Sequence, residues 1–342
     1  MSKDREKNII ATIKDVARDA GVSISTVSRV VNKKGGVSEE LEDRITEAIT
    51  RLKYRPNIVA RALKAKSTKS IGLIIPSIEN PVFPPLVKVI EDTAKRYGFS
   101  IILCNSDGIL EEEAKYLGLL VEKQVDGIIL NAIGDYHQRF DVVRNMNTPI
   151  LVLGRKIEGF LTTTVTIDNF QGAYMAVEYL IKSGMKDIAF LYGFLEASSA
   201  INDRFEGYKQ ALKDHNLRFR KNLVVKGNRS LEGGVYATEE LLKHKIKFDA
   251  VFASNDVMAI GCMGKLLDLG YSIPGDVSIM GYDDIPMADV IRPHLSTVRS
   301  PIKEFGTEAV KTVLRMIYTK KDNFSEKNFD AELIVRESTR KL

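Results

Sequence analysis

Seven short apolar runs, spread over residues 71–282, constrain the fold of this chain more than any other feature. They alternate with stretches that carry apolar residues at helical spacing. Strands as uniformly apolar as these are buried on both faces, which is typical of parallel sheets covered by helices. We therefore predict an α/β body of doubly wound parallel sheets. The runs are IGLII (71–75), SIILC (100–104), DGIIL (126–130), PILVL (149–153), DIAFLYG (187–193), AVFA (250–253) and VSIMGY (277–282).

The body is long enough to form two lobes. At 342 residues the chain exceeds one ordinary domain, and its hydrophobic content of 44% supports a sizeable core. Ligands of such sheets bind at the carboxyl ends of the strands, so we expect a binding cleft between the lobes.

Residues 12–32 have a different pattern, which predicts two short helices around a tight turn. Thr12 can cap the first helix, Gly21 can end it at positive φ, and Ser23 can cap the second. An ordinary helical hairpin would explain these features taken alone. However, small polar groups and one arginine on the outward face of the second helix suit close approach to a DNA major groove. These outward residues are Ile24, Ser25, Ser28 and Arg29.

The charge of the chain is concentrated at this end. Residues 1–69 carry 16 Lys+Arg against 9 Asp+Glu, whereas residues 70–342 carry 34 against 36. A basic module on a near-neutral body indicates that the head meets a polyanion while the body has another role. A third helix, which Ser38 is expected to cap, begins with acids and suits a supporting role.

Catalysis, a metal site and a cofactor are not expected. The four histidines lack metal-ligand spacing, and the first βα turn, IIPSIENP, lacks the glycines of a dinucleotide fingerprint. Cys104 and Cys262 lie far apart, which is typical of buried thiols in a reducing compartment. The N-terminus lacks the apolar core of a secretory signal and no stretch is apolar enough to span a membrane. We therefore expect a cytoplasmic protein with no membrane partner.

The segment TIKDVARDAGVSISTVSRVVN, followed by YRPNIVARAL, resembles the DNA-binding head of the lactose/galactose-repressor (LacI/GalR) family of bacterial transcription regulators. The resemblance implies an all-α helix-turn-helix head with a hinge helix, followed by a two-lobed periplasmic-binding-protein-like body. The implied parts are a basic tail (1–11), a helix-turn-helix domain (12–56), a hinge helix and linker (57–68), and an effector-binding and dimerisation domain (69–342). Three crossings would divide the body into an amino-proximal lobe (about 70–166 plus 298–325) and a distal lobe (about 167–297 plus 326–342).

The same resemblance implies roles on double-stranded operator DNA. A homodimer would read a near-palindromic operator, because two-fold protein symmetry imposes two-fold DNA symmetry. The expected base contacts in the major groove are Ile24, Ser25 and Arg29. The expected phosphate contacts are Thr12, Ser23, Thr26, Ser28 and Asn32. The expected hinge contacts in the minor groove are Asn57, Arg61 and Leu63, with Leu63 as an apolar wedge at the central base step.

Polar and aromatic residues follow several predicted strands, where a ligand of the body would lie. The resemblance implies that Arg204, Asn255 and Asp283 bind hydroxyl groups of a sugar-like effector. We expect Asp256 and Asp284, in contrast, to cap helices or link strands. The full set of expected effector-binding residues is Asn80, Phe83, Asn131, Arg155, Arg204, Arg229, Asn255 and Asp283.

The cleft departs from the family pattern at two places. Many relatives carry an acid after the strand PILVL, but this chain has Gly154 followed by Arg155. It also has Arg229 in a loop where some relatives place an aromatic residue. Together with Lys303, these cations favour an anionic effector, such as a sugar acid or a sugar phosphate.

A ligand-controlled repressor of carbohydrate-utilisation genes explains the head, the hinge and the body together. A transport-type sugar-binding protein explains only the body and requires a secretion signal that is missing. A dehydrogenase explains the alternation of strands and helices, but this chain lacks the phosphate-binding loop of such an enzyme. Some relatives depend on a phosphoprotein co-repressor, but nothing in this sequence supports such a partner. Induction and co-repression by the effector both remain open.

Overall fold

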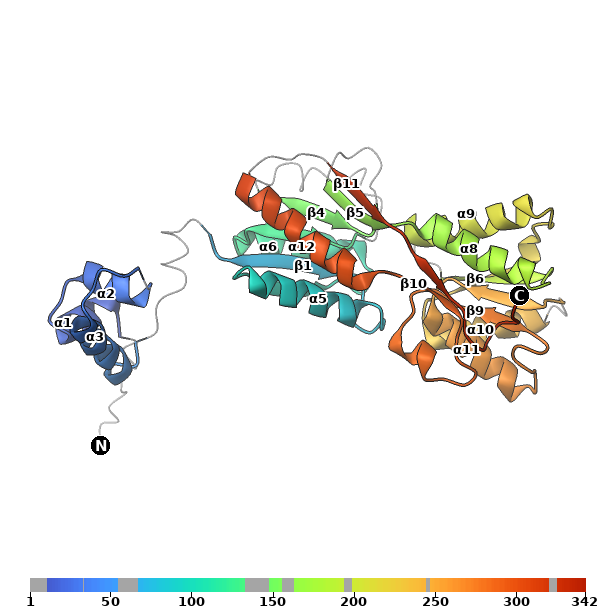
Figure 1. Ribbon diagram of the computed structural model, residues 1–342, viewed down its shortest axis with the longest axis horizontal. Helices are drawn as coiled ribbons and strands as arrows, with labels where there is room; N and C mark the ends of the chain where they lie inside the picture. Colours follow the sequence, from blue (N-terminus) through green and yellow to red (C-terminus); the bar gives the residue numbers. More distant parts are fainter. Residues whose placement is uncertain are drawn as a thin grey trace, which may run out of the picture. The chain divides into compact units, whose positions relative to one another are not determined.

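The computed structural model describes residues 11–32, 34–54, 67–132, 148–155, 163–193, 199–243, 247–319 and 325–342. Contacts divide the chain into two units, Met1–Thr68 and Lys69–Leu342, which we call the head and the body (Figure 1). Each folds around its own core. Among the described helices, none combines the length and apolar character needed to cross a membrane.

The head consists of three helices: α1 (Ile13–Asp19), α2 (Ile24–Val31) and α3 (Glu39–Arg51). The backbone N–H of Thr12 donates to the Asp15 carboxylate (2.9 Å), and Gly21 has φ +64°, as expected at the two ends of α1. Ser23 Oγ caps α2 by accepting from the Thr26 backbone N–H (3.1 Å). The predicted helix-turn-helix is therefore confirmed. Its buried core is Val16, Ala17, Ala20, Val27, Ile45 and Ala48.

One detail of the head differs from the prediction. Ser38 stands at the N-cap position of α3, but its side chain makes no capping hydrogen bond within the described helix. Three acids in the first turn stabilise the positive end of the helix dipole instead.

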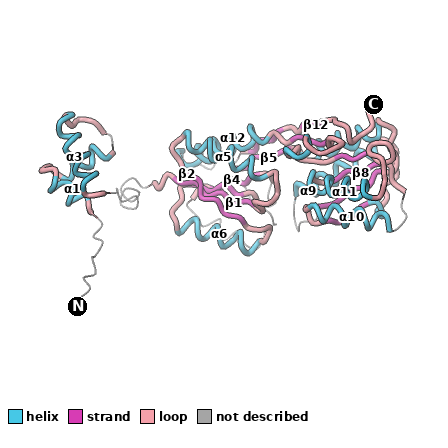
Figure 2. The backbone as a smooth tube through the Cα atoms, turned by 90° about the horizontal axis from the view of Figure 1, so that it is seen from below, coloured by secondary structure: helices cyan, strands magenta, loops and turns pink. Residues whose placement is uncertain are grey.

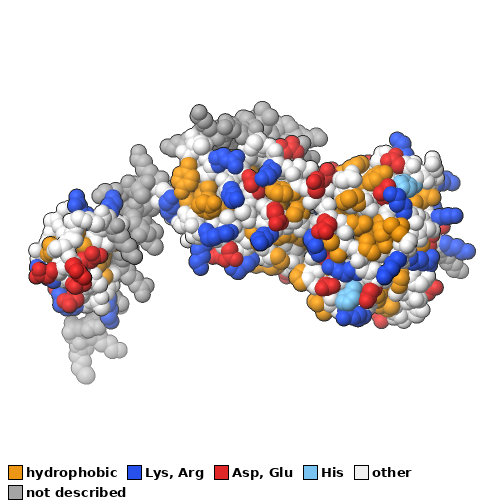
Figure 3. Space-filling view, in the orientation of Figure 1, with side chains coloured by type: hydrophobic (Ala, Val, Ile, Leu, Met, Phe, Trp, Pro, Cys, Tyr) orange, Lys and Arg blue, Asp and Glu red, His pale blue; other side chains and the backbone are white. Residues whose placement is uncertain are grey.

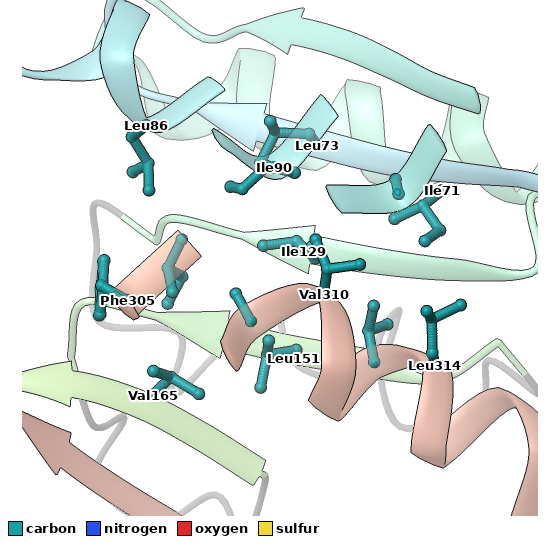
Figure 4. Packing of buried hydrophobic residues seen from close by; sticks show 14 of the residues in the cluster. Ile71, Leu73, Leu86, Ile90, Ile129, Leu151, Val165, Phe305, Val310 and Leu314 are labelled. Atoms are coloured by element: carbon teal, nitrogen blue, oxygen red, sulfur yellow. The ribbon is translucent and has the colours of Figure 1, made fainter. Parts of the chain in front are cut away.

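The first lobe of the body is a six-stranded parallel sheet in the order β11-β5-β4-β3-β1-β2. Helices α5 and α12 pack on one face around Leu73, Ile90 and Val310 (Figure 4), and α6 packs on the other around Leu117 and Leu120. The elements are β1 (Ser70–Ile75), α5 (Phe83–Arg96), β2 (Ser100–Asn105), α6 (Leu110–Glu122), β3 (Gly127–Leu130), β4 (Ile150–Leu153), β5 (Thr163–Ile167), α12 (Ile302–Thr319) and β11 (Glu326–Phe329).

The second lobe is a four-stranded parallel sheet in the order β7-β6-β8-β9. Helices α8 and α9 cover one face, and α10 and α11 cover the other, as Figure 1 shows. Figure 2 shows the body from below. The elements are α8 (Asn169–Lys182), β6 (Ile188–Gly193), α9 (Ser199–Asp214), η1 (Lys221–Leu223), β7 (Val224–Gly227), α10 (Leu231–Lys243), β8 (Ala250–Ala253), α11 (Asp256–Asp268), β9 (Ser278–Met280) and η2 (Pro286–Asp289).

All seven apolar runs of the sequence form strands, so the predicted α/β body of doubly wound parallel sheets is confirmed. The chain crosses between the lobes three times, first after β5. The strands β10 (Thr297–Arg299) and β12 (Glu332–Ile334) belong to the other two crossings and pair with each other in antiparallel orientation.

One lobe boundary has to be corrected. Residues 326–342 were expected in the distal lobe, but β11 pairs in parallel with β5 at the edge of the amino-proximal sheet, as Figure 1 shows. The third crossing therefore follows Phe329. The sequence of β11, EKNF, is polar and largely exposed, which suits an edge strand and gives no apolar run to recognise.

Candidate functional site

The exposed face of α2 is the candidate DNA-reading surface. Ile24 is 44% exposed, and Ser25 and Arg29 are exposed beside it. Helix α2 contains no acid, whereas α3 contains five, and in Figure 3 the acidic side chains of the head gather over α1 and α3. Because phosphates repel carboxylates, α2 is the helix suited to enter a groove.

Hydroxyl and amide groups surround the two ends of α2. Ser23 Oγ lies 2.6 Å from Ser25 Oγ and 2.8 Å from Thr26 Oγ1. At the other end, Asn32 Nδ2 donates to the Ser28 backbone oxygen (2.6 Å). These groups, with Thr12 at the start of α1, are the expected phosphate contacts, and they lie on or beside the helix-turn-helix. The expected hinge residues Asn57, Arg61 and Leu63 lie outside the described residues.

A cavity of about 150 Å³ in the body is the candidate effector site. All eight residues expected at the cleft line it. Four come from the amino-proximal lobe and four from the distal lobe, so the cavity lies between the lobes. They are Asn80, Phe83, Asn131 and Arg155 on one side, and Arg204, Arg229, Asn255 and Asp283 on the other.

Arg204 is the centre of the polar wall of this cavity. Its Nη2 donates to Asp283 Oδ1 (3.1 Å) and its Nη1 donates to the Ser254 backbone oxygen (2.5 Å). Its Nε donates to Asn169 Oδ1 (2.9 Å), and its guanidinium carbon lies 3.5 Å from the centre of the Tyr282 ring. Arg204 on α9 thus contacts three other segments at the cleft, which carry Asn169, Ser254 and the pair Tyr282 and Asp283.

Asp283 presents a constrained carboxylate beside Arg204. Its side chain is 7% exposed, and its φ of +112° is rare for a residue other than glycine. Burial raises the pKa of Asp283, and the Arg204 guanidinium opposes that rise. A carboxylate and a guanidinium group held side by side can accept from and donate to neighbouring hydroxyls of one ligand.

The three asparagines that were predicted at the cavity also have structural partners. Asn255 Oδ1 caps α11 by accepting from the Met258 N–H (2.9 Å), and its Nδ2 donates to the Arg229 backbone oxygen (3.3 Å). Asn131 Nδ2 donates to the Leu153 backbone oxygen (3.1 Å), and Asn80 Oδ1 accepts from a backbone N–H in its own turn. These bonds fix the orientation of each side chain at the cavity wall.

Asp256 and Asp284 link neighbouring segments, as expected, but the residue that caps α11 is Asn255. Asp256 is fully buried and accepts from the Ile285 N–H (2.8 Å) and the Thr297 hydroxyl (2.5 Å). Asp284 forms ion pairs of 2.7 Å with both Arg299 and Arg336.

Some lining residues were not predicted, and one predicted cation does not line the cavity. Asn169, which orients Arg204, follows the strand β5. Because β5 has the threonine-rich sequence TTVTI and no apolar run, the sequence did not identify Asn169 as a residue at the end of a strand. Lys303 was expected to contribute charge, but it is exposed and is not part of the cavity wall. The other unpredicted residues are mostly apolar and include Leu86, Leu153, Ile167, Ile201, Ile302 and Phe305.

Comparisons with known proteins cover both units. Residues 12–57 match the family described as bacterial regulatory proteins, lacI family, and residues 177–339 match a periplasmic binding protein-like domain. The ribose operon repressor of Halalkalibacterium halodurans is 37% identical over 331 residues, which cover 97% of this chain and 98% of that protein.

Solved structures agree with these matches. The lac repressor dimer bound to operator and the anti-inducer ONPF aligns with a TM-score of 0.88 at 27% identity, over 96% of this chain and 99% of that one. A LacI family transcriptional regulator from Enterococcus faecium with bound ribose aligns with a TM-score of 0.72 at 33% identity, over 80% of this chain and 99% of that one. The chain belongs to the lacI family of bacterial transcription regulators.

Proposed function

We propose that this protein is a repressor that binds a near-palindromic operator as a homodimer and is controlled by a sugar-like effector in the cleft between its lobes. The observation that carries the proposal is a cavity to which each lobe contributes four of the eight expected residues. The operator places the protein in the cytoplasm, where bacterial DNA lies. Genes of carbohydrate use are the expected targets, because the similar proteins include a ribose operon repressor.

The size of the cavity favours a small effector. An engineered protein cavity of about 150 Å³ holds one benzene molecule, so a single sugar ring is the appropriate scale here. Phe83 and the apolar wall supply a surface for the ring, while Arg204 and Asp283 are placed for its hydroxyls. Ribose, named for two of the similar proteins, is the first sugar to test.

The proposed mechanism is a population shift. A ligand that touches both lobes favours the lobe arrangement in which both sets of contacts form. In a dimer, this arrangement sets the spacing between the two linkers that enter the heads. The ligand therefore changes operator affinity by the difference in its affinity for the two arrangements.

Selection of genomic fragments by the purified full chain tests this function. We expect the bound fragments to share a site with two-fold symmetry, and the affinity for that site to change when the effector is added. If the protein showed no preference among duplexes at moderate salt, with or without sugars, the proposed function would be wrong.

Replacing Arg29 with Ala is expected to relax base preference in each half-site. An arginine that forks onto a guanine contributes about 1–3 kcal/mol of discrimination at one base pair. Selection from a randomised operator measures this as a loss of preference at one symmetric pair of positions. Arg18→Ala on α1 is the matched control, because Arg18 is also exposed and its loss should leave every base preference intact. Unchanged preference in Arg29→Ala would exclude a base contact.

Replacing Leu63 with Ser is expected to weaken operator binding without affecting dimerisation. The prediction is based on the sequence, because an apolar wedge that unstacks a base step opens more protein surface to the bent duplex. Gel-shift affinity and sedimentation measure the two properties separately. Equal operator affinity in the variant would remove the wedge from the mechanism.

A further inference from the structure

The charges that line the cavity do not balance. Three arginines and one aspartate contribute to its wall. Arg204 is paired with Asp283 at 3.1 Å, and Arg155, which is 6% exposed, also interacts with protein groups. Arg229 is the arginine whose charge needs an explanation.

Arg229 has no close counter-charge in the described part of the chain. Within those residues, no carboxylate oxygen lies within 4.0 Å of its guanidinium group, and its buried Nε has no hydrogen-bond partner. Burial lowers the pKa of Arg229, and Asp283, whose closer partner is Arg204, opposes that effect. The guanidinium nevertheless stays protonated at neutral pH.

The surrounding structure holds Arg229 at the cavity wall. Its backbone is in the left-handed region (φ +64°), and its carbonyl oxygen accepts from Asn255 Nδ2. Its aliphatic stem passes over Gly193 at the end of β6, where an added Cβ would lie 2.7 Å from Arg229 Cγ. The absence of a side chain at Gly193 therefore makes room for the arginine at the cleft.

A partly buried cation without a partner costs free energy, and so does a positive φ in a residue other than glycine. A ligand that places a negative charge beside the guanidinium group offsets the first cost. We infer that the effector is an anionic sugar derivative, whose carboxylate or phosphate group binds Arg229 while its hydroxyls bind Arg204 and Asp283. This inference rests on the proposed function, because it concerns the ligand of the same cleft.

Calorimetric titration of the full chain with matched ligands tests the inference. The two series are ribose, ribonate and ribose 5-phosphate, and glucose, gluconate and glucose 6-phosphate. We expect an anion of one series to bind on the order of tenfold or more tightly than its neutral parent, since hydrogen bonds to charged groups are the strong ones. Increasing salt should reduce this difference.

Two variants assign the difference to Arg229. Arg229→Gln keeps much of the side-chain length and is expected to remove the preference for the anion while changing the affinity for the neutral sugar less than about threefold. Lys303→Gln removes the same charge from an exposed residue outside the cavity and should preserve the preference.

Four outcomes overturn the inference: a neutral sugar that binds as tightly as its anions, an anion preference that survives Arg229→Gln, an equal loss of neutral and anionic binding in that variant, or no binding of any anion in the panel. The proposed function is judged independently by operator selection. A protein that selects an operator and responds only to a neutral sugar would retain the function and lose the inference.

Discussion

Replacing Arg204 with Met is expected to lower the free energy of unfolding of the body by about 3–5 kcal/mol, the range typical of breaking one side of a buried ion pair. The variant leaves the Asp283 carboxylate buried without its cation, and it leaves the Ser254 carbonyl and the Asn169 amide without their donor. It also removes the group that faces the Tyr282 ring. Urea unfolding of the full chain, followed by far-UV circular dichroism, measures the loss, and calorimetry should detect no effector binding.

The double variant Arg204→Met, Asp283→Asn separates the lost charge pair from lost packing. Asparagine keeps the shape of Asp283 and tolerates positive φ, but it carries no charge to leave unpaired. We expect the double variant to be more stable than Arg204→Met at pH 8 and still unable to bind the effector. Burial already raises the pKa of Asp283. Protonation of Asp283 at low pH removes the unpaired charge from Arg204→Met, so the difference in free energy of unfolding between the two variants should become smaller. A single variant as stable as the wild type would contradict this account.

The polar wall was predictable because strands and clefts are linked by topology. Each apolar run predicts a buried parallel strand, and the carboxyl ends of parallel strands meet at one edge. Residues within two positions after such runs, including Asn131, Asn255 and Asp283, therefore had to lie near one another, and the cavity brings them together. Arg204 and Arg229 lie on a helix and in a loop, so the family resemblance was needed to identify them.

Strands without an apolar signature were not predictable. The strands β5 (TTVTI) and β7 (VVKG) each mix apolar residues with polar or charged ones. Neither therefore gives an apolar run that predicts a strand. Missing β5 meant missing Asn169, which orients Arg204. The strand β11 caused the one wrong boundary, since the charged sequence EKNF does not indicate which sheet it joins.

Competing hydrogen bonds also limit what the sequence predicts. Asn255 was expected to bind the effector, and it does line the cavity, but its oxygen caps α11 and its nitrogen holds the Arg229 loop. Sequence alone gives the residue type and its place after a strand. It does not give the partners that use the side chain, and these decide how much of it a ligand can reach.

Replacing Asp256 with Asn is expected to flatten the dependence of stability on pH. Asp256 is fully buried, and burial raises its pKa well above 3.8, with the neighbouring Asp283 charge adding to the rise. Below pH 3.8 the carboxyl group is protonated in both the folded and the unfolded chain. As the pH increases above that value, the unfolded chain releases this proton while the folded chain keeps it, so the free energy of unfolding falls until the pH passes the folded pKa. For one proton the fall approaches about 1.4 kcal/mol per pH unit.

Asparagine at this position retains both hydrogen bonds, because its oxygen can accept from the Ile285 N–H and its amide can donate to the Thr297 hydroxyl. It does not titrate, so urea unfolding of Asp256→Asn from pH 4 to pH 8 should give a shallower decline than the wild type, with the remaining slope including that of Asp283. Asp268→Asn, an exposed position on the same helix, controls for the loss of a carboxylate in α11 and should leave the decline as it is. If the free energy of unfolding fell with pH equally in Asp256→Asn and the wild type, Asp256 would keep its charge on folding. The hydrogen bonds from Thr297 and Ile285 would then be sufficient to stabilise a buried carboxylate beside the strands that link the lobes.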